Sequence, residues 1–288
     1  MTSATSAAAT TTRRARHLAP GAAALAALGV WAAWIEPRSL QVRREELTLS
    51  HWPSELDGLR LGVLTDLHAG MPHVGLDAVE RAAEALAAER PDLVCLLGDF
   101  IDRRALFARP VNADALATRL APLAAAPRGL YAVLGNHDWY AGARRIGDAL
   151  EGAGVMVLED SAAPAGDGGL WVAGTGDFRV RGARVERALM PVPEDAPVLL
   201  LSHDPDAFPS VPARVSVTLA GHTHGGQVGV PLVRRPFIPS HYGERFLAGH
   251  IEEDGRHLYV SSGVGTSGLP VRFLRPPEVV SLTLRAPS

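Results

Sequence analysis

The chain has 288 residues, of which 47% are hydrophobic, and a formal charge of −3. It is therefore long and apolar enough to bury a full core, and we do not expect it to be disordered. Such a charge gives no long-range field for gathering nucleic acid, which argues against a nucleic-acid-binding protein. No linker separates compositionally different halves, so we predict one large domain. Cys95 is the only cysteine, so no internal disulfide can form, and its apolar neighbours predict a buried thiol.

The first forty residues have the layout of a targeting segment. Arg13, Arg14 and Arg16 precede an uncharged run from Leu18 to Ile35, and Glu36-Pro37 ends this run. A basic flank followed by an apolar stretch and a polar exit is typical of a signal sequence or a signal anchor.

We therefore predict that residues 1–40 are a signal sequence or signal anchor and that residues 41–288 form the folded domain. Basic flanks remain on the cytoplasmic side of a membrane. The folded domain is then expected at the extracytoplasmic face of the cell membrane, held there by the anchor or released after export.

Beyond this segment, short apolar runs alternate with helical patterns, which is typical of an α/β layered fold. Each run is short and apolar enough to be a buried strand. The predicted strands are Leu61–Thr65, Leu93–Leu97, Leu130–Leu134, Val198–Leu201 and Val215–Leu219. Apolar residues at helical spacing predict one helix over about 76–86 and another over about 113–123.

Polar residues follow each predicted strand immediately in the chain. The strand ends read Asp66-Leu-His68, Gly98-Asp99, Gly135-Asn-His-Asp138, Ser202-His203-Asp204 and Gly221-His-Thr-His224. Ligands of open α/β sheets bind beyond the carboxyl ends of the strands, so these side chains should converge on one crevice. Ordinary surface turns use Gly, Asn, Asp and Ser, whereas repeated histidines indicate a metal site.

The ordered motifs DxH, GDxxD, GNHD, an isolated histidine after a strand and GHTH resemble those of the calcineurin-like metallophosphoesterases. The resemblance covers roughly residues 59–284. The strings LSHDPDAF, LAGHTHGGQVGVP and PPEVVSLTL look like the bacterial exported or membrane-anchored branch. The resemblance implies a four-layer αββα sandwich of two mixed central sheets flanked by helices, with residues 41–288 as the catalytic domain of a phosphoester hydrolase.

The resemblance also implies a centre with two divalent transition-metal ions. Asp99 would bridge both ions, because a shared carboxylate offsets the repulsion between two close cations. The implied ligands are Asp66, His68 and His224 for one metal, Asn136, His203 and His222 for the other, and Asp99 for both. Two such ions about 3.5–4 Å apart activate water and neutralise phosphate charge. Mixed imidazole and carboxylate ligands favour manganese, iron or zinc over magnesium or calcium.

His137 has a different implied role. Its neighbour Asn136 points to the metal, so a His137 placed in a turn can face the substrate. The resemblance makes His137 the catalytic residue that protonates or stabilises the leaving oxygen. Asp138 is then expected to orient the His137 ring.

Two further residues are candidates for substrate binding. Arg103 ends the string GDFIDR, where some relatives use an arginine on phosphate; the alternative is a solvated surface arginine. His73 lies in a loop with Gly and Pro after DLHAG, at a place that can line the substrate mouth. Asp102 either hydrogen-bonds a metal-ligating histidine or caps the helix that follows.

The complete ligand set favours an enzyme that hydrolyses a phosphomonoester or phosphodiester of the cell envelope, with a phosphorylated small molecule or lipid as substrate. The alternative is a metal-dependent phosphate-binding scaffold with weak catalysis. A nuclease ranks lower because no basic stripe with interleaved aromatic residues is present. We expect a monomer that contacts the membrane through its N-terminal segment.

Overall fold

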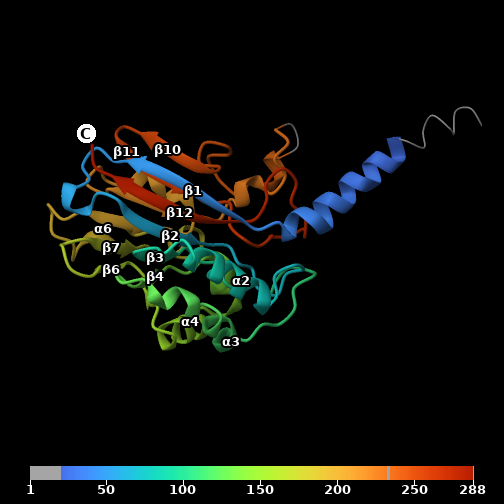
Figure 1. The fold of residues 1–288 in the computed structure, drawn as a ribbon, viewed down its shortest axis with the longest axis horizontal. Coiled ribbons are helices and arrows are strands. Elements are labelled where there is room, and N and C mark those ends of the chain that lie inside the picture. Colours follow the sequence, from blue (N-terminus) through green and yellow to red (C-terminus); the bar gives the residue numbers. More distant parts are fainter. Residues whose placement is uncertain (1–20, 232–233, 288) are drawn as a thin grey trace, which may run out of the picture.

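The computed structural model describes residues 21–231 and 234–287 and contains two sheets of six strands each (Figure 1). In spatial order, the first sheet contains β1 (Gln41–Thr48), β12 (Glu278–Arg285), β2 (Leu59–Leu64), β3 (Leu93–Leu96), β4 (Leu130–Ala132) and β5 (Met156–Val157). The second contains β10 (Gly249–Glu253), β11 (Arg256–Val260), β9 (Val217–Ala220), β8 (Val198–Leu201), β7 (Trp171–Gly174) and β6 (Ser161–Pro164).

Both sheets are mixed. In the first, β2 to β5 run parallel, and β12 lies antiparallel to β2 and parallel to β1. In the second, β11, β9, β8 and β7 run parallel, while β10 and β6 are antiparallel to their neighbours. The carboxyl ends of the parallel strands therefore share one edge in each sheet.

Helices cover the outer face of each sheet (Figure 1). The first sheet is covered by α2 (Leu76–Ala87), α3 (Ala113–Thr118) and α4 (Asn136–Gly152), and the second by α6 (Val185–Leu189) and η5 (Pro205–Ser210). The other short turns are η3 (Ser54–Leu56), η4 (Ala121–Ala125), α5 (Phe178–Arg181), η6 (His224–Gly226) and η7 (Arg235–Phe237). The predicted four-layer αββα sandwich is confirmed.

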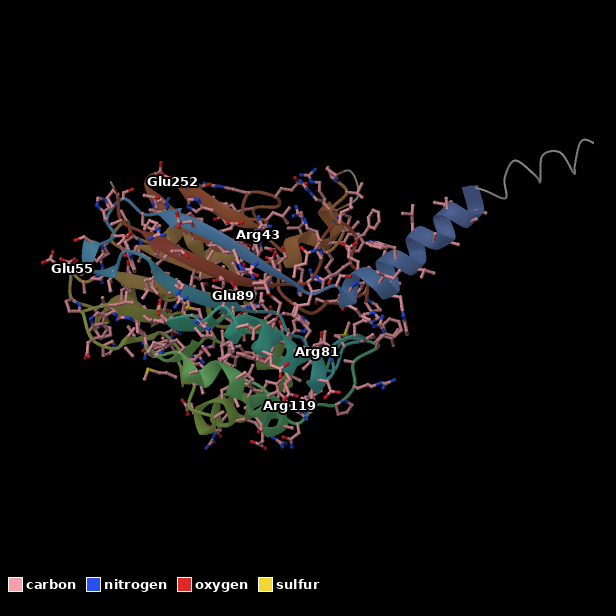
Figure 2. All side chains as sticks on the ribbon, in the orientation of Figure 1. Arg43, Glu55, Arg81, Glu89, Arg119 and Glu252 are labelled. Carbon is pink, nitrogen blue, oxygen red and sulfur yellow. The ribbon has the colours of Figure 1, made fainter. Side chains whose placement is uncertain are left out.

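The central strands are apolar throughout because both of their faces are buried. In β3, Leu93 and Cys95 face the core between the sheets, whereas Val94 and Leu96 face the helices. Cys95 is fully buried, as predicted, and this burial raises the pKa of its thiol. Charged side chains such as Glu55, Arg81 and Glu252 are exposed on the outside (Figure 2).

All five predicted strands are present, and the first predicted helix corresponds to α2. The second predicted helix consists of α3 followed by the 3-10 turn η4. The expected turn around His137 was wrong, because α4 begins at Asn136 and places His137 in its first helical turn.

The N-terminal arginines 13, 14 and 16 lie outside the described residues. Residues 21–30 are helical, and η1 (Trp31–Ile35) and η2 (Glu36–Arg38) continue this helix. Together they form a segment that projects from the body of the molecule (Figure 1). In the part of the chain that the structure describes, no helix is both long and apolar enough to cross a membrane.

Candidate metal and active site

The seven predicted ligands meet at the edge formed by the carboxyl ends of the parallel strands. Five strands supply them, since each ligand lies just after the end of β2, β3, β4, β8 or β9. The exposed fraction of each of these residues is 6% or less. The convergence expected from the strand ends is therefore present, although the set comes from two different sheets.

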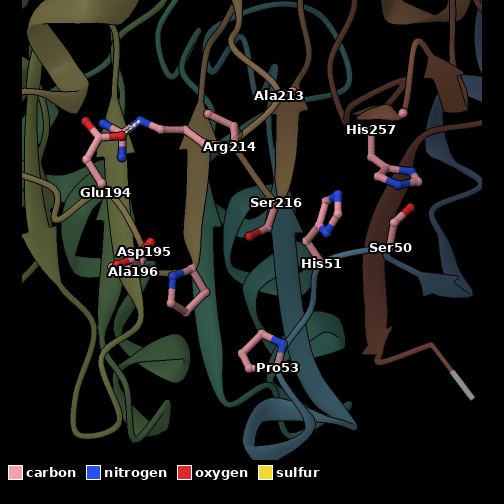
Figure 3. A pocket seen from close by; sticks show the side chains of 13 residues that line it. Ser50, His51, Pro53, Glu194, Asp195, Ala196, Ala213, Arg214, Ser216 and His257 are labelled. Atoms are coloured by element: carbon pink, nitrogen blue, oxygen red, sulfur yellow. Dashed lines mark ion pairs between the residues drawn. The ribbon is translucent and has the colours of Figure 1, made fainter.

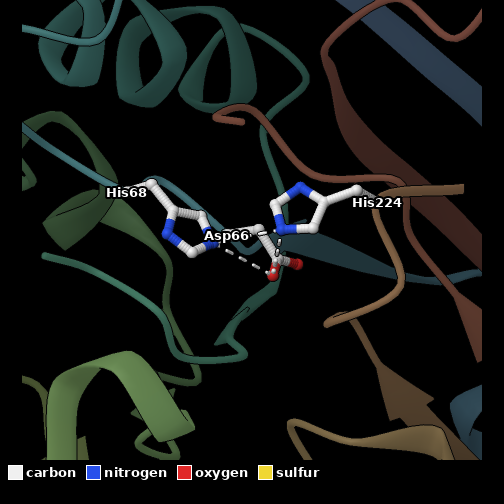
Figure 4. Close-up of side chains that lie close together, drawn as sticks. All are labelled: Asp66, His68 and His224. Atoms are coloured by element: carbon white, nitrogen blue, oxygen red, sulfur yellow. Dashed lines mark hydrogen bonds and ion pairs between the residues drawn. The ribbon is translucent and has the colours of Figure 1, made fainter. Parts of the chain in front are cut away.

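Asp66, His68 and His224 form the first group of donor atoms (Figure 4). Asp66 Oδ1 lies 3.8 Å from His68 Nε2 and 3.5 Å from His224 Nε2. The two ring nitrogens are themselves 3.1 Å apart. All three donor atoms thus point to one place.

Asp99, His203 and His222 form the second group. Asp99 Oδ2 lies 3.2 Å from His203 Nε2 and 3.4 Å from His68 Nε2, which belongs to the first group. One carboxylate oxygen therefore faces a histidine of each group, as a bridging ligand must.

The donor atoms of the second group fit a divalent cation. His203 Nδ1 donates to Leu97 O at 2.7 Å, and His222 Nε2 donates to Pro239 O at 3.0 Å. The remaining ring nitrogens, His203 Nε2 and His222 Nδ1, face each other at 3.1 Å. A shared cation would stabilise this approach. Asn136 Oδ1 is buried without a hydrogen-bond partner among the described residues, and a cation would also satisfy it.

The charges at this edge favour a bound cation as well. Burial alone would raise the pKa of Asp99, but the facing His203 and His68 hold it well below its ordinary value. Burial would lower the pKa of His68, but the neighbouring carboxylates of Asp102 and Asp66 raise it to about 10. The ionised carboxylates therefore stabilise positive charge between them, which divalent metal ions supply in place of ring protons.

The backbone at the site is strained in a way that the sequence did not reveal. Five ligands have left-handed φ angles: Asp66 (51°), His68 (44°), Asp99 (53°), His222 (68°) and His224 (51°). Each such conformation costs on the order of 1–2 kcal/mol in a residue with a Cβ. The surrounding structure must hold these residues in place, and the strain aims their side chains into the site.

His137 is held by Asp102. Asp102 Oδ2 lies 3.1 Å from His137 Nδ1 and 3.3 Å from His68 Nδ1, so one carboxylate orients both rings. Asp102 Oδ1 meanwhile accepts hydrogen bonds from the backbone N–H groups of Arg104 and Ala105. The predicted contact of Asp102 with the ring of His68 agrees with these distances, whereas the alternative, a cap on the helix that follows, was wrong, because these N–H groups belong to a turn and the next helix begins at Ala113. Asp102 lies on the Nδ1 side of the His137 ring, so His137 Nε2 points away from this carboxylate, and 20% of the His137 side chain is exposed.

The predicted pairing of Asp138 with His137 was wrong. Asp138 is fully buried and accepts hydrogen bonds from the backbone N–H groups of Phe100, Ile101 and Gly135. Burial raises the pKa of Asp138 to about 7. Helix α4 turns this side chain toward the loop after β3, so Asp138 ties two ligand loops together instead of orienting His137.

Comparison with known proteins agrees with this geometry. Residues 59–226 match the profile of the calcineurin-like phosphoesterases. The chain belongs to the calcineurin-like phosphoesterase family. The predicted enzyme class, a metal-dependent phosphoric ester hydrolase, is thereby confirmed.

Three curated relatives illustrate the similarity. An uncharacterized metallophosphoesterase of Aquifex aeolicus is 36% identical over 77% of this chain and 83% of its own. Phosphodiesterase YaeI of Escherichia coli is 35% identical over 77% of this chain and 80% of its own. A transmembrane protein with metallophosphoesterase domain from Danio rerio is 30% identical over 91% of this chain and 61% of its own.

The two residues predicted to bind substrate lie away from the ligand groups of this phosphoesterase. Arg103 is exposed, and its Nη2 lies 3.5 Å from Val111 O, because the turn capped by Asp102 directs Arg103 outward. His73 Nε2 lies 3.3 Å from Pro270 O, and its ring packs edge-on against Trp34. The structure does not bring either side chain to the metal ligands.

Arg272 supports the site and was not singled out in the sequence. It is fully buried, and its guanidinium donates to the carbonyl oxygens of Ser262, Gly263 and Gly265 at 2.8 to 3.0 Å. Gly265 N donates to Asp66 O at 2.6 Å, and a Cβ on Gly263 would collide with the Asp66 side chain. Burial lowers the pKa of Arg272 to about 10, so it stays charged at neutral pH. Arg272 therefore fixes the loop that presses on Asp66.

Two other residues near His137 were not predicted from the sequence to belong to the site. Ser267 Oγ lies 3.5 Å from His137 Nε2, and only a Gly- and Ser-rich stretch marks its loop in the sequence. Tyr140 lies with its ring 6.1 Å from the His137 ring. Its neighbour Trp139 packs against the core instead.

A hollow of about 240 Å³ lies elsewhere on the phosphoesterase (Figure 3). It is lined by the segment after β1, which includes His51, by residues that precede β8 and β9, and by His257 of β11. Arg214 pairs there with Glu194 at 4.0 Å. None of the predicted metal ligands lines it. The carboxyl edge is therefore the site that we connect with catalysis.

Proposed function

We propose that the protein is a two-metal phosphodiesterase that acts on a phosphorylated or lipid-linked substrate of the cell envelope. The observation that carries this proposal is the position of Asp99 Oδ2 between His68 of one ligand group and His203 of the other. A bridging carboxylate between two groups of buried donors is the arrangement that holds paired cations. Manganese, iron or zinc suits the mixed donors.

The chain's own residues then divide the work. Bound divalent cations supply an activated water and neutralise the phosphate oxygens. His137, whose Nδ1 is fixed by Asp102 at 3.1 Å, presents Nε2 on the partly exposed side of the ring. This nitrogen is placed to donate a proton to the leaving oxygen. Asp102 keeps the ring oriented during that transfer.

The diester preference is supported by the name of the Escherichia coli relative, a phosphodiesterase. The outward position of Arg103 agrees with it, because a dianionic monoester often recruits an additional arginine. A catalytically weak phosphate-binding scaffold is the second candidate. The complete set of buried donors and the oriented His137 favour the enzyme over that scaffold.

The test is a rate panel on the full chain with an aryl phosphate, a bis-aryl phosphate and a phospholipid, each with manganese, zinc or iron. We expect the two diesters to be hydrolysed faster than the monoester and a chelator to abolish turnover. Metal binding without turnover on any ester would support the scaffold. Faster cleavage of the monoester would overturn the diester preference.

We further propose that residues 1–40 are a signal sequence or anchor and that residues 41–288 act as a monomer at the extracytoplasmic face of the membrane. The uncharged run up to Ile35 and the transmembrane relative from Danio rerio support this proposal. A reporter that is active only outside the cytoplasm, fused after Ser50, tests export. An inactive reporter would refute export, and a shortened soluble product outside the cytoplasm would refute the anchor alone.

A further inference from the structure

Several large apolar side chains are exposed beside the catalytic edge. We call five of them the apolar rim: Trp31 (45% exposed), Trp34 (62%), Phe107 (47%), Leu269 (51%) and Leu274 (62%). Scattered single apolar residues are normal on a protein surface, but a gathered patch marks an interaction site.

Several contacts join the members of the apolar rim. Trp34 and Phe107 line one cavity of about 470 Å³, together with Val74 and Val111. His73, which lines the same cavity, packs on Trp34 with ring centroids 6.0 Å apart and lies 3.3 Å from the carbonyl of the residue after Leu269. Arg272 N, two residues before Leu274, donates to Ala32 O at 2.9 Å. The rim is thus one surface built from four separate segments.

The rim is attached directly to the active site. Ser267, 3.5 Å from His137 Nε2, is only two residues from Leu269 in the same loop. Ser267 N and Leu269 O both hydrogen-bond the side chain of Gln227, which fixes this connection. The rim therefore adjoins the loop that contacts His137.

Fold stability does not explain these side chains. Leu274 has a left-handed φ of 56° and is 62% exposed, so it gains little from burial and has a costly backbone conformation. Leu106, next to Phe107, is 88% exposed. Apolar side chains at such positions are available for contact with something outside the chain.

The charge around the rim is strongly positive although the whole chain is slightly acidic. The four rim segments, residues 31–38, 71–75, 103–111 and 267–275, contain one carboxylate and six arginines, of which Arg272 is fully buried. That carboxylate, Glu36, is 4% exposed and is engaged by Trp31 Nε1 and Arg275 N. Arg38 covers the face of the Trp34 ring at 3.7 Å. Five arginines therefore lie around the apolar side chains, and none of them pairs with a carboxylate among the described residues.

We propose that the apolar rim docks on a bilayer containing anionic phospholipids, so that the catalytic edge faces the membrane surface. Tryptophans prefer the boundary between headgroups and acyl chains, and arginines bind lipid phosphates. The helix over residues 21–35, which has no charged residue, projects from the same end of the molecule (Figure 1). The proposal rests on the proposed function only for the identity of the site that faces the bilayer.

The test places an environment-sensitive dye on the full chain at Phe107→Cys or Leu274→Cys. Met190→Cys is the matched control, because Met190 is 81% exposed and directly follows α6, at the opposite end of the molecule (Figure 1). The native Cys95 is buried and will not react. With vesicles of phosphatidylcholine and phosphatidylglycerol we expect a blue shift of the dye at both rim positions and none at Met190.

A charge variant completes the experiment. Arg109→Glu in the rim is expected to weaken partitioning onto anionic vesicles about 10-fold, because each basic residue near such a surface contributes about 1 kcal/mol. Arg187→Glu, on α6, is expected to have no effect. A chain that floats with the vesicles without a dye shift at the rim, or an equal shift on pure phosphatidylcholine, would overturn the proposal. No readout requires hydrolysis, so failure of the proposed activity would be seen separately.

Discussion

The catalytic edge, where the carboxyl ends of the parallel strands meet, adjoins the core between the two sheets, but the two regions differ in polarity and in backbone conformation. In the core, Val63, Leu199 and Leu219 are fully buried, apolar and in regular strand conformation. At the edge, buried carboxylates and imidazoles face one another, and five of the ligands have left-handed φ angles. The distance between these environments is a few residues along each strand.

This difference indicates that the core supplies the stability with which the edge is held in its strained conformation. Apolar burial contributes about 25 cal/mol per Å², whereas unpaired buried polar groups and left-handed backbone each cost free energy. Substitutions at the edge should therefore affect metal binding and turnover, and those in the core should affect the free energy of unfolding. The following experiments examine this separation.

Asp99→Ala is expected to have the largest effect, a complete loss of turnover and of paired metal. Asp99 Oδ2 faces both ligand groups, so no other side chain replaces its bridging charge. Metal content and the rate on a bis-aryl phosphate measure the effect. The matched control is Asp114→Ala, an exposed position in α3. Full metal occupancy in Asp99→Ala would contradict the assigned bridge.

His137→Ala should retain its metals and slow turnover by ~10²–10⁴-fold, the usual loss on removing a general acid. Asp102→Asn should slow turnover less, by ~10–100-fold, because it disturbs the orientation of the His137 and His68 rings without removing either side chain. Metal analysis beside steady-state rates distinguishes these variants from Asp99→Ala. An empty site in His137→Ala would show that His137 is a ligand.

Leu199→Ala tests the other side of the comparison. Leu199 is fully buried between the sheets, so its truncation leaves a cavity and should lower the free energy of unfolding by ~2–5 kcal/mol. Urea unfolding measures this loss. We expect kcat per folded molecule to be unchanged. A parallel fall in kcat would show that the core and the edge are not separable.

Glu159→Gln is expected to have the smallest effect, and one that depends on pH. Both carboxylate oxygens of Glu159 are buried without a hydrogen-bond partner among the described residues, and burial raises the pKa of Glu159 to about 7. Between its ordinary pKa of 4.5 and this value, the native state binds more protons than the unfolded state. Stability therefore falls as the pH rises through this range.

The neutral glutamine avoids that loss. After allowance for partial solvent screening, we expect Glu159→Gln to gain ~1–2 kcal/mol over the natural protein at pH 8 and nothing at pH 4. Urea unfolding at the two pH values measures the difference. A gain of equal size at both values would show that burial of the charge is not the cause.

The four layers and the set of seven metal ligands were predicted from the resemblance to the family, whereas the five central strands and the polar residues that follow them were predicted from the sequence pattern. These features are local: an apolar run such as Leu93–Leu97 reports a strand with two buried faces, and a ligand such as Asp99 directly follows its strand. The carboxyl ends of parallel strands meet at one edge, so convergence of the ligands follows from the order of elements.

Only the tertiary structure decided the partners. In the structure His137 contacts Asp102 instead of Asp138, and Arg103 points outward. The structure also inserts β12 between β1 and β2 and buries Arg272 behind Asp66. The physical reason is that these outcomes depend on sheet register, helix direction and loop hydrogen bonds between residues far apart in the chain. No local pattern carries that information, because the same residue in a turn and in the first turn of a helix points its side chain in different directions.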